Sequence, residues 1–253
     1  MMINERFRNK VAIITGSADG IGKGVACRLG KEGAVLALFD INKESLEKTI
    51  AEFQQQGINA KGYIVDVSCE SQVTDAIRLV EKEWDRIDIL VHAAGIVGIT
   101  NTKITEFPTA EFDKIYEVNL RGSFLMTKYT LQVMKKTGSG RLLLIASIAG
   151  KEGNPGMIGY SSTKAGVIGL VKGAAKEFAD TNITVNGLAP AVIRTTMNDN
   201  TSSEQLAYMT AKIPMQRLGT ISEVAAISCY IVSEENSFST GFIYDISGGR
   251  ATY

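Results

Sequence analysis

The chain has 253 residues, of which 45% are hydrophobic and 21% are charged, and its formal net charge at pH 7 is zero. This length fits one large α/β domain, and the absence of a cationic run argues against nucleic acid as a main partner. No apolar run approaches the ~20 residues that span a bilayer, and residues 1–10 lack the apolar core of a signal peptide. Three scattered cysteines and one histidine predict a cytoplasmic protein without a disulfide framework or metal site.

The first predicted strand, Val11–Thr15, leads into a glycine-rich turn and a helix over Lys23–Lys31. Such a turn forms an anion site, because backbone N–H groups and the helix dipole point at a phosphate. Its spacing, Gly-x-x-x-Gly-x-Gly, differs from the common Gly-x-Gly-x-x-Gly fingerprint. The residues predicted to bind a dinucleotide here are Gly16, Asp19, Gly20, Ile21 and Gly22; the alternative is a plain glycine-rich turn.

The second predicted strand, Ala34–Phe39, ends at an acidic residue. Asp40 lies twenty positions after Gly20, the separation at which a carboxylate meets the adenosine ribose hydroxyls. A carboxylate accepts hydrogen bonds from a diol and repels a 2′-phosphate, and the neighbouring Ile41 is uncharged. These residues predict NAD rather than NADP as the cofactor, although Lys43 is a basic residue nearby.

The third predicted strand, Gly62–Val67, follows a helix over Glu44–Gln56. Asp66 in this strand is predicted to bind the adenine amino group, with Val67 beside it. The alternative is that Asp66 caps the helix that begins near Glu70.

The fourth predicted strand, Ile87–Val91, comes after an amphipathic helix over Val73–Trp84. His92 follows the strand, and we interpret it as a structural or ribose-side contact rather than a catalytic base. Small residues then allow the backbone to pack closely on a ligand; they are Ala93, Ala94 and Gly95.

A long helix is predicted over Glu111–Lys136, and Asn119 is a polar residue among its apolar ones. A buried amide without partners is costly. Asn119 is therefore expected either to kink the helix and hold a water or to be solvated.

The fifth predicted strand, Leu142–Ala146, ends at Ser147 and leads through a Gly- and Pro-rich loop to Tyr160 and Lys164. Tyr160 and Lys164 are four residues apart, so they lie on one face of a helix. A cation near a phenol favours the phenolate and lowers its pKa, toward the range in which proton transfer is efficient at neutral pH. The pattern predicts a general acid/base, although a Tyr-x-x-x-Lys pair also arises by chance.

The remaining elements are a helix over Ala165–Ala179, a strand over Ile183–Leu188, a helix over Ile221–Val232 and a strand over Phe242–Ile246. Residues 196–220 follow no clear period and are predicted to form a lid over the substrate, with two short helical pieces.

Strands and helices alternate throughout, which predicts a single domain over residues 1–253. Its fold class is α/β: a Rossmann-like, doubly wound, seven-stranded parallel sheet with helices on both faces. Ligands of such sheets bind at the carboxyl ends of the strands. The candidate residues share that placement because each follows a strand end: Thr15, Asp40, Asp66, Ala93, Ser147 and Pro190.

Together these motifs, in this order and over nearly the whole chain, resemble the classical short-chain dehydrogenase/reductase family. The resemblance implies that Tyr160 transfers the substrate proton, that Lys164 holds the nicotinamide ribose, that Ser147 orients the substrate and that Asn119 anchors a water. It further implies nicotinamide-side contacts from Pro190, Ile193 and Thr195, and a homotetramer built through the long helices. His92 and Ala191 depart from the family pattern, in which Asn and Gly are usual.

The loop after Gly150 and the C-terminal tail are similar to those of NAD-dependent dehydrogenases of 2-dehydro-3-deoxy sugar acids, of the L-rhamnonate and L-fuconate type. A sugar acid needs a cation for its carboxylate, and a guanidinium suits that group. The candidate substrate residues are Asn154, Arg194 and Arg250; each arginine has the alternative of a surface or subunit contact.

Two other functions fit part of the pattern. A 3-oxoacyl-[acyl-carrier-protein] reductase would share the fold and catalytic residues, but it usually takes NADPH, against which Asp40 argues. A non-catalytic NAD-binding protein on this fold commonly lacks the Tyr or the Lys, and both are present here.

Overall fold

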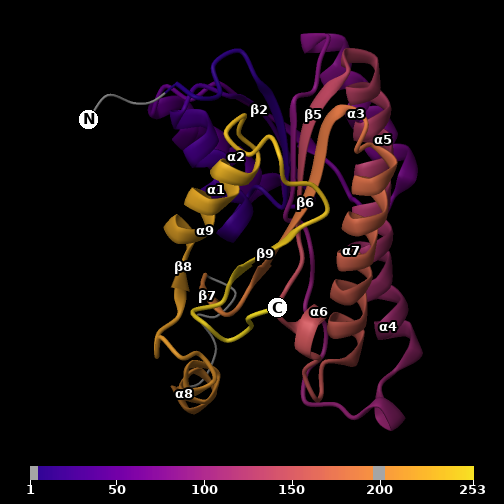
Figure 1. The fold of residues 1–253 in the computed structure, drawn as a ribbon, viewed down its shortest axis with the longest axis vertical. Helices are drawn as coiled ribbons and strands as arrows, with labels where there is room; N and C mark the ends of the chain where they lie inside the picture. Colours follow the sequence, from indigo (N-terminus) through magenta and orange to yellow (C-terminus); the bar gives the residue numbers. More distant parts are fainter. Residues whose placement is uncertain (1–4, 196–202) are drawn as a thin grey trace.

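The computed structural model describes residues 5–195 and 203–253. Within these residues, seven parallel strands form one sheet in the order β3-β2-β1-β4-β5-β6-β9 (Figure 1). The strands are β1 (Val11–Thr15), β2 (Val35–Asp40), β3 (Ala60–Ile64), β4 (Ile89–His92), β5 (Ser139–Ile145), β6 (Asn182–Pro190) and β9 (Ile243–Ile246). The predicted seven-stranded parallel sheet is confirmed, and its strand order reverses between β1 and β4.

Helices cover both faces of the sheet (Figure 1). One face packs against α3 (Glu70–Trp84), α5 (Gly122–Thr137) and α7 (Ile158–Glu177), and the other against α1 (Gly20–Lys31), α2 (Lys43–Gln55) and α9 (Ile221–Ile231). Because both faces are covered, the central strands are apolar on both sides: all five residues of β1 are buried.

One helical region and one strand differ from the sequence-based bounds. The long predicted helix consists of α4 (Thr109–Tyr116), a π-helical turn η2 (Glu117–Arg121) and α5. The third strand lies earlier than predicted, at Ala60–Ile64, so that Asp66 follows the strand instead of belonging to it. Two further short helical elements are η1 (Ile104–Glu106) and α6 (Ala149–Glu152).

The segment predicted as a lid contains one of the two expected helical pieces, α8 (Ser203–Ala211). It ends in β8 (Gly219–Thr220), which pairs in parallel with β7 (Ile193–Arg194). Residues 196–202 of the predicted lid lie outside the described residues, and the lid remains a prediction.

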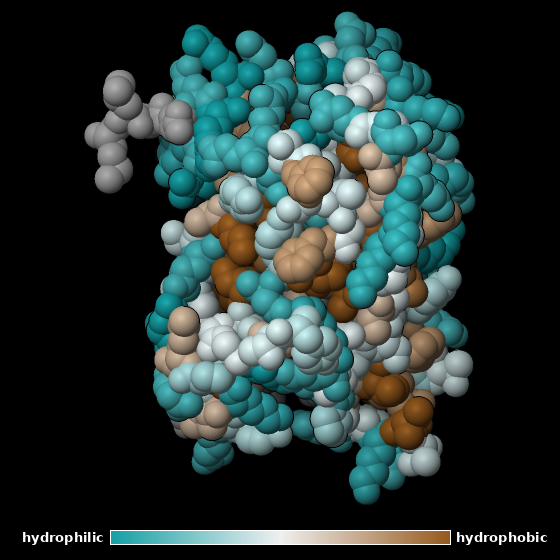
Figure 2. All heavy atoms as spheres, in the orientation of Figure 1, coloured by the Kyte–Doolittle hydropathy of each residue, from teal (hydrophilic) through white to brown (hydrophobic). Residues whose placement is uncertain are grey.

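Figure 2 shows apolar side chains gathered in the middle of one face, framed by hydrophilic residues above and below. Strand β9 is the outermost strand of the sheet on this side. The segment leading into it carries two exposed aromatic side chains, Phe238 and Phe242. None of the described helices is both long and apolar enough to cross a membrane.

Candidate active site

A cavity of about 340 Å³ opens at the carboxyl ends of the central strands. Most of the predicted cofactor and catalytic residues line it, which places them in one site; they are Gly16, Asp19, Gly20, Ile21, Gly22, Ala93, Ala94, Gly95, Ser147, Tyr160, Lys164, Pro190, Ile193 and Thr195. Of the six strand-end residues named from the sequence, three line this cavity and three do not: Ala93, Ser147 and Pro190 line it, and Thr15, Asp40 and Asp66 lie outside its lining.

The glycine-rich turn is closed tightly against its surroundings. Gly16 has φ +62°, and a Cβ added to it would lie 2.9 Å from the Ala94 backbone. A Cβ on Gly22 would lie 2.0 Å from the carbonyl oxygen of Gly16. Only glycine fits these two positions, and the bare backbone at the start of α1 suits a pyrophosphate group. The residues present therefore fit a dinucleotide.

Side chains from β2 and α2 hold the turn in place. The Asp40 carboxylate accepts a hydrogen bond from the Ala18 N–H at 2.9 Å, and the buried Thr49 hydroxyl donates to the Ala18 carbonyl at 2.9 Å. The Ser17 hydroxyl donates to the carbonyl of Phe39 at 3.1 Å. Asp40 thus anchors the turn, and its contact with an adenosine ribose stays a prediction.

His92 lies beneath the cavity floor rather than in its wall. The Thr15 hydroxyl oxygen accepts from the N–H groups of Ala93 and Ala94, each at 3.1 Å, so its own proton points at His92 Nδ1, 2.8 Å away. The proton of neutral His92 is then on Nε2, which is buried without a partner. The interpretation of His92 as a structural residue fits this placement, whereas a direct ribose contact does not, because the side chain is buried.

Burial, and secondarily the charge of Lys164, lowers the pKa of His92 to about 3. The imidazole is therefore neutral across the physiological range and supplies a fixed acceptor for Thr15. This accords with the expectation that His92 is no catalytic base.

The residues predicted to contact adenosine lie outside the cavity lining, after the ends of β2 and β3. Ile41 is 66% exposed beside Asp40, while Val67 is buried against Gly122. The Asp66 carboxylate accepts from the N–H and hydroxyl of Ser68 at 2.9 and 2.7 Å. The alternative that Asp66 caps α3 is wrong, because Cys69 occupies the N-cap position.

Asn119 is fully buried in the π-helical turn, so the alternative that it is solvated is wrong. Its side chain exchanges two hydrogen bonds with the backbone of Ile96, at 2.8 and 2.9 Å. It also donates to the Thr163 hydroxyl at 3.3 Å. The amide thereby joins the η2 turn to the strand-end segment after Gly95 and to α7.

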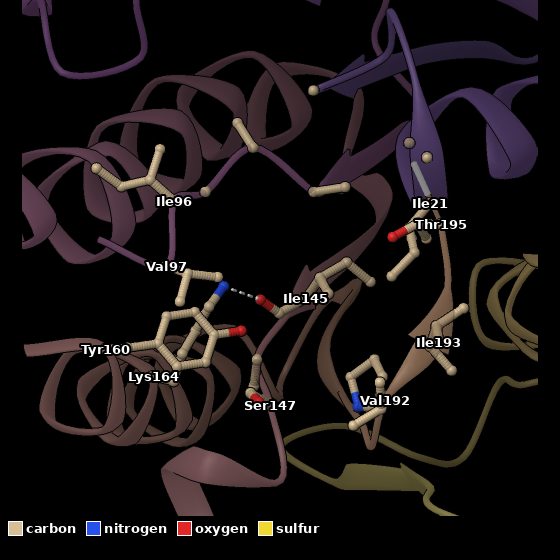
Figure 3. A pocket seen from close by; sticks show the side chains of 18 of the residues that line it. Ile21, Ile96, Val97, Ile145, Ser147, Tyr160, Lys164, Val192, Ile193 and Thr195 are labelled. Carbon is tan, nitrogen blue, oxygen red and sulfur yellow. Dashed lines mark hydrogen bonds between the residues drawn. The ribbon is translucent and has the colours of Figure 1, made fainter. Parts of the chain in front are cut away.

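Ser147, Tyr160 and Lys164 converge on the cavity from β5 and α7 (Figure 3). The Tyr160 hydroxyl faces the cavity beside Ser147. The Lys164 ammonium donates to the carbonyl of Ile145 at 2.8 Å and lies 5.8 Å from the centre of the Tyr160 ring. Two hydroxyls and one ammonium therefore share a single buried corner.

The electrostatics of this corner differ from the sequence-based expectation. Burial raises the pKa of Tyr160, and the hydrogen bond with Ser147 opposes this rise only in part. Burial also lowers the pKa of Lys164 to about 8. The predicted lowering of the Tyr160 pKa by Lys164 is thus wrong for this structure, because burial raises the pKa of the phenol instead.

The three candidate substrate residues separate into two places. Arg194 is exposed between Ile193 and Thr195, which line the cavity. Arg250 lies in the C-terminal tail, where it donates to the Asn154 side chain at 3.1 Å. Neither arginine is among the lining residues.

Sequence reasoning missed the apolar part of the described cavity wall. These residues have no chemical signature in the sequence, and only the fold brings them together; they include Ile96, Val97, Ile145, Ala146, Met157, Ala191 and Val192. Among the described lining residues, Lys164 is the sole basic one.

Residues 16–251 match a family model described as Enoyl-(Acyl carrier protein) reductase. The chain is 40% identical over 248 residues to a 2-dehydro-3-deoxy-L-rhamnonate dehydrogenase (NAD(+)) of Sphingomonas sp. (strain SKA58), covering 98% of both chains. It is 34% identical to the 3-oxoacyl-[acyl-carrier-protein] reductase FabG of Thermotoga maritima, covering 96% of this chain and 98% of that one. Among solved structures, an NAD+-bound xylitol dehydrogenase superposes with a TM-score of 0.90 at 30% identity, covering 96% and 99%. Given this likeness and the convergence of Ser147, Tyr160 and Lys164, the chain belongs to the short-chain dehydrogenase/reductase family of oxidoreductases.

Proposed function

We propose that this protein is an NAD-dependent dehydrogenase that moves a hydride between nicotinamide and a secondary alcohol or ketone of a sugar acid or related polyol. The observation that carries the proposal is that the hydroxyls of Tyr160 and Ser147 face the same cavity as the glycine-rich turn. Asp40 supports NAD, since its carboxylate would repel a 2′-phosphate. A bound dinucleotide would accept or supply the hydride.

Each catalytic residue has a role that its surroundings permit. Tyr160 takes the proton from the alcohol, or returns it to the ketone, at its hydroxyl. Ser147 donates to the substrate oxygen and holds it beside Tyr160. Lys164, fixed by Ile145, presents its ammonium to the ribose, and Asn119 anchors a water beside Lys164.

The substrate class rests on the Sphingomonas relative, whose name gives a sugar acid, and on a structural neighbour named for a polyol. Arg194 remains the candidate for a substrate carboxylate, because it is exposed next to the lining residue Thr195. Arg194→Ala should raise KM for a sugar acid more than for xylitol; equal changes would remove this role.

Residues 196–220 would act as the lid, since they continue from the lining residue Thr195. A homotetramer would cover the exposed aromatic side chains on α4 and α5, which are Phe112, Tyr116 and Phe124. Light scattering of the purified protein should give about four times the chain mass, and Phe124→Glu should reduce it.

The FabG relatives favour a second candidate, reduction of a 3-oxoacyl thioester. That activity predicts a preference for NADPH. Parallel assays with NADH and NADPH on an acetoacetyl thioester separate the two functions, and a strong NADPH preference would favour the reductase.

The main test is a screen of the purified protein with NAD against 2-dehydro-3-deoxy-L-rhamnonate, other sugar acids and xylitol. Tyr160→Phe should lower kcat by roughly 10²- to 10⁴-fold, the usual contribution of a general acid/base. The control is Tyr230→Phe, which changes an exposed tyrosine on α9 and should retain full activity. An active Tyr160→Phe enzyme would contradict the proton-transfer role.

A further inference from the structure

The chain between Ser147 and Tyr160 joins the two hydroxyls of the site, yet it contains little regular structure. It consists of the four-residue helix α6 and a loop in which Gly153 and Gly156 have positive φ. A four-residue helix has too few internal hydrogen bonds to be stable alone. The relative position of Ser147 and Tyr160 therefore depends on what the rest of the molecule does to this segment.

The C-terminal tail, residues 247–253, supplies that restraint. The guanidinium of Arg250 donates through Nε and Nη2 to one oxygen of Glu152, at 3.0 and 2.7 Å. Nη2 also donates to the Asn154 side chain at 3.1 Å. The side chain of Arg250 is only 8% exposed and that of Glu152 28%, so solvent screens this pair less than an exposed one.

The contacts continue from Asn154 toward the catalytic helix. The Asn154 backbone N–H donates to the Ser161 hydroxyl at 3.0 Å, and Ser161 follows Tyr160 directly. The Asn154 side chain also contacts the sulfur of Met157 at 3.9 Å, and Met157 lines the cavity. One arginine is thus linked through Asn154 to the first turn of α7.

A second attachment is independent of Arg250. The Lys151 ammonium pairs with Asp245 at 2.5 Å, and its side chain is 7% exposed. The hydroxyl of Tyr253 donates to the Lys151 carbonyl at 2.9 Å. Loss of Arg250 would therefore loosen the segment without detaching it, and the variant should still fold.

We propose that Arg250 is a positioning residue: with Glu152 and Asn154 it fixes the segment between Ser147 and Tyr160, and it does not receive the charge of the substrate. Its guanidinium is already paired with a carboxylate and does not line the cavity. A substrate carboxylate would have to displace Glu152 to reach it, and removing one partner of a buried pair is costly.

The positioning role and the carboxylate-binding role predict opposite effects of Glu152→Ala on activity toward a sugar acid. If Arg250 positions the segment, Arg250→Ala and Glu152→Ala break the same link. Both should lower kcat, roughly 10- to 100-fold for a misplaced catalytic group, and the double variant should be no worse than either single one. If Arg250 instead receives a carboxylate, Glu152→Ala frees the guanidinium and lowers KM for a sugar acid, while Arg250→Ala raises it. That outcome would overturn the proposal.

A measurement without substrate separates this inference from the proposed function. Hydrogen–deuterium exchange read by mass spectrometry should speed up over residues 148–157 in both single variants, while the affinity for NAD stays the same. The matched control is Lys136→Ala, which breaks the exposed Lys136–Glu81 ion pair remote from the cavity and should leave exchange in this segment unaltered. Unchanged exchange in Arg250→Ala would refute the positioning role even if no sugar acid is turned over.

Discussion

The two ends of the cavity are held by different kinds of interaction. At the nucleotide end, the glycine-rich turn is tied by short hydrogen bonds from residues of the adjoining β2 and α2, such as Thr49 and Asp40. At the other end, the segment after Ser147 is tied by two ion pairs to residues far away in sequence. Lys151 pairs with Asp245 of β9, 94 positions away, and Glu152 pairs with Arg250 of the tail, 98 positions away. The first end is held by hydrogen bonds to backbone groups of the turn itself, whereas the second is held by pairs between long charged side chains. The first end suits an invariant cofactor and the second a variable substrate.

Lys164 stands where the two ends meet, and its substitution should give the largest effect. Lys164→Met should lower kcat by roughly 10²- to 10⁴-fold and yet raise the free energy of unfolding near neutral pH. The reason is that burial lowers the pKa of Lys164 from 10.5 to about 8, so a charged ammonium destabilises the folded state below that pH.

The sign of this effect is tested by pH. Between pH 8 and 10.5 the unfolded chain holds the Lys164 proton more tightly than the folded one, so the stability of the parent protein rises through this window. The advantage of Lys164→Met in urea unfolding should therefore shrink as pH rises from 8 to 10.5. An advantage that stays constant would contradict the buried-charge explanation; Lys136→Met is the exposed control.

Asp40→Asn tests the nucleotide end, and its effect should be intermediate in size between those of the other two substitutions. The amide oxygen can still accept from the Ala18 N–H, so the turn should stay ordered, while the negative charge that repels a 2′-phosphate is lost. The kcat/KM preference for NAD over NADP should fall by roughly tenfold, a change of about 1.4 kcal/mol. Glu44→Gln, at the start of α2, is the control for a general change in charge, and unaltered selectivity in Asp40→Asn would refute the ribose assignment.

Thr49→Val should give the smallest effect and sharpen the contrast between the ends. It removes one hydrogen bond to the Ala18 carbonyl, worth about 1 kcal/mol, so the Kd for NAD should rise roughly fivefold while kcat stays the same. Thr49→Ser keeps the hydroxyl and should bind NAD like the parent protein. A fall in kcat without a change in Kd would mean that the two ends are not held separately.

The nucleotide end was largely predictable from sequence because its parts are close together in the chain. Gly16, Gly20 and Gly22 lie in one turn, and Asp40 ends the next strand. The central strands are recognisable apolar runs, and parallel strands bring their carboxyl ends to one edge. These local patterns are enough to predict both the sheet and the position of the cavity.

The substrate end was not predictable in the same way. Arg250 and Glu152 are 98 positions apart, and neither has a local signal that pairs them. The raised pKa of Tyr160 depends on burial, which the spacing to Lys164 does not reveal. Asn119 was suspected of kinking its helix, but the sequence did not indicate a π-helical turn or the partner Ile96.

The π-helical turn η2 restricts insertions and deletions in this stretch of the chain. A π-turn holds about one residue more than an α-turn, and each residue of an α-helix advances the side-chain direction by about 100°. Helix α5 therefore begins out of phase with α4 by that rotation. Deleting one residue from 117–121 would restore an unbroken helix, but it would swing either Asn119 away from Ile96 or the core residues Leu125 and Met126 out toward solvent. A change in length here would thus disturb the Asn119–Ile96 contact or the packing of the core, whereas a point substitution can alter one side chain without this rotation.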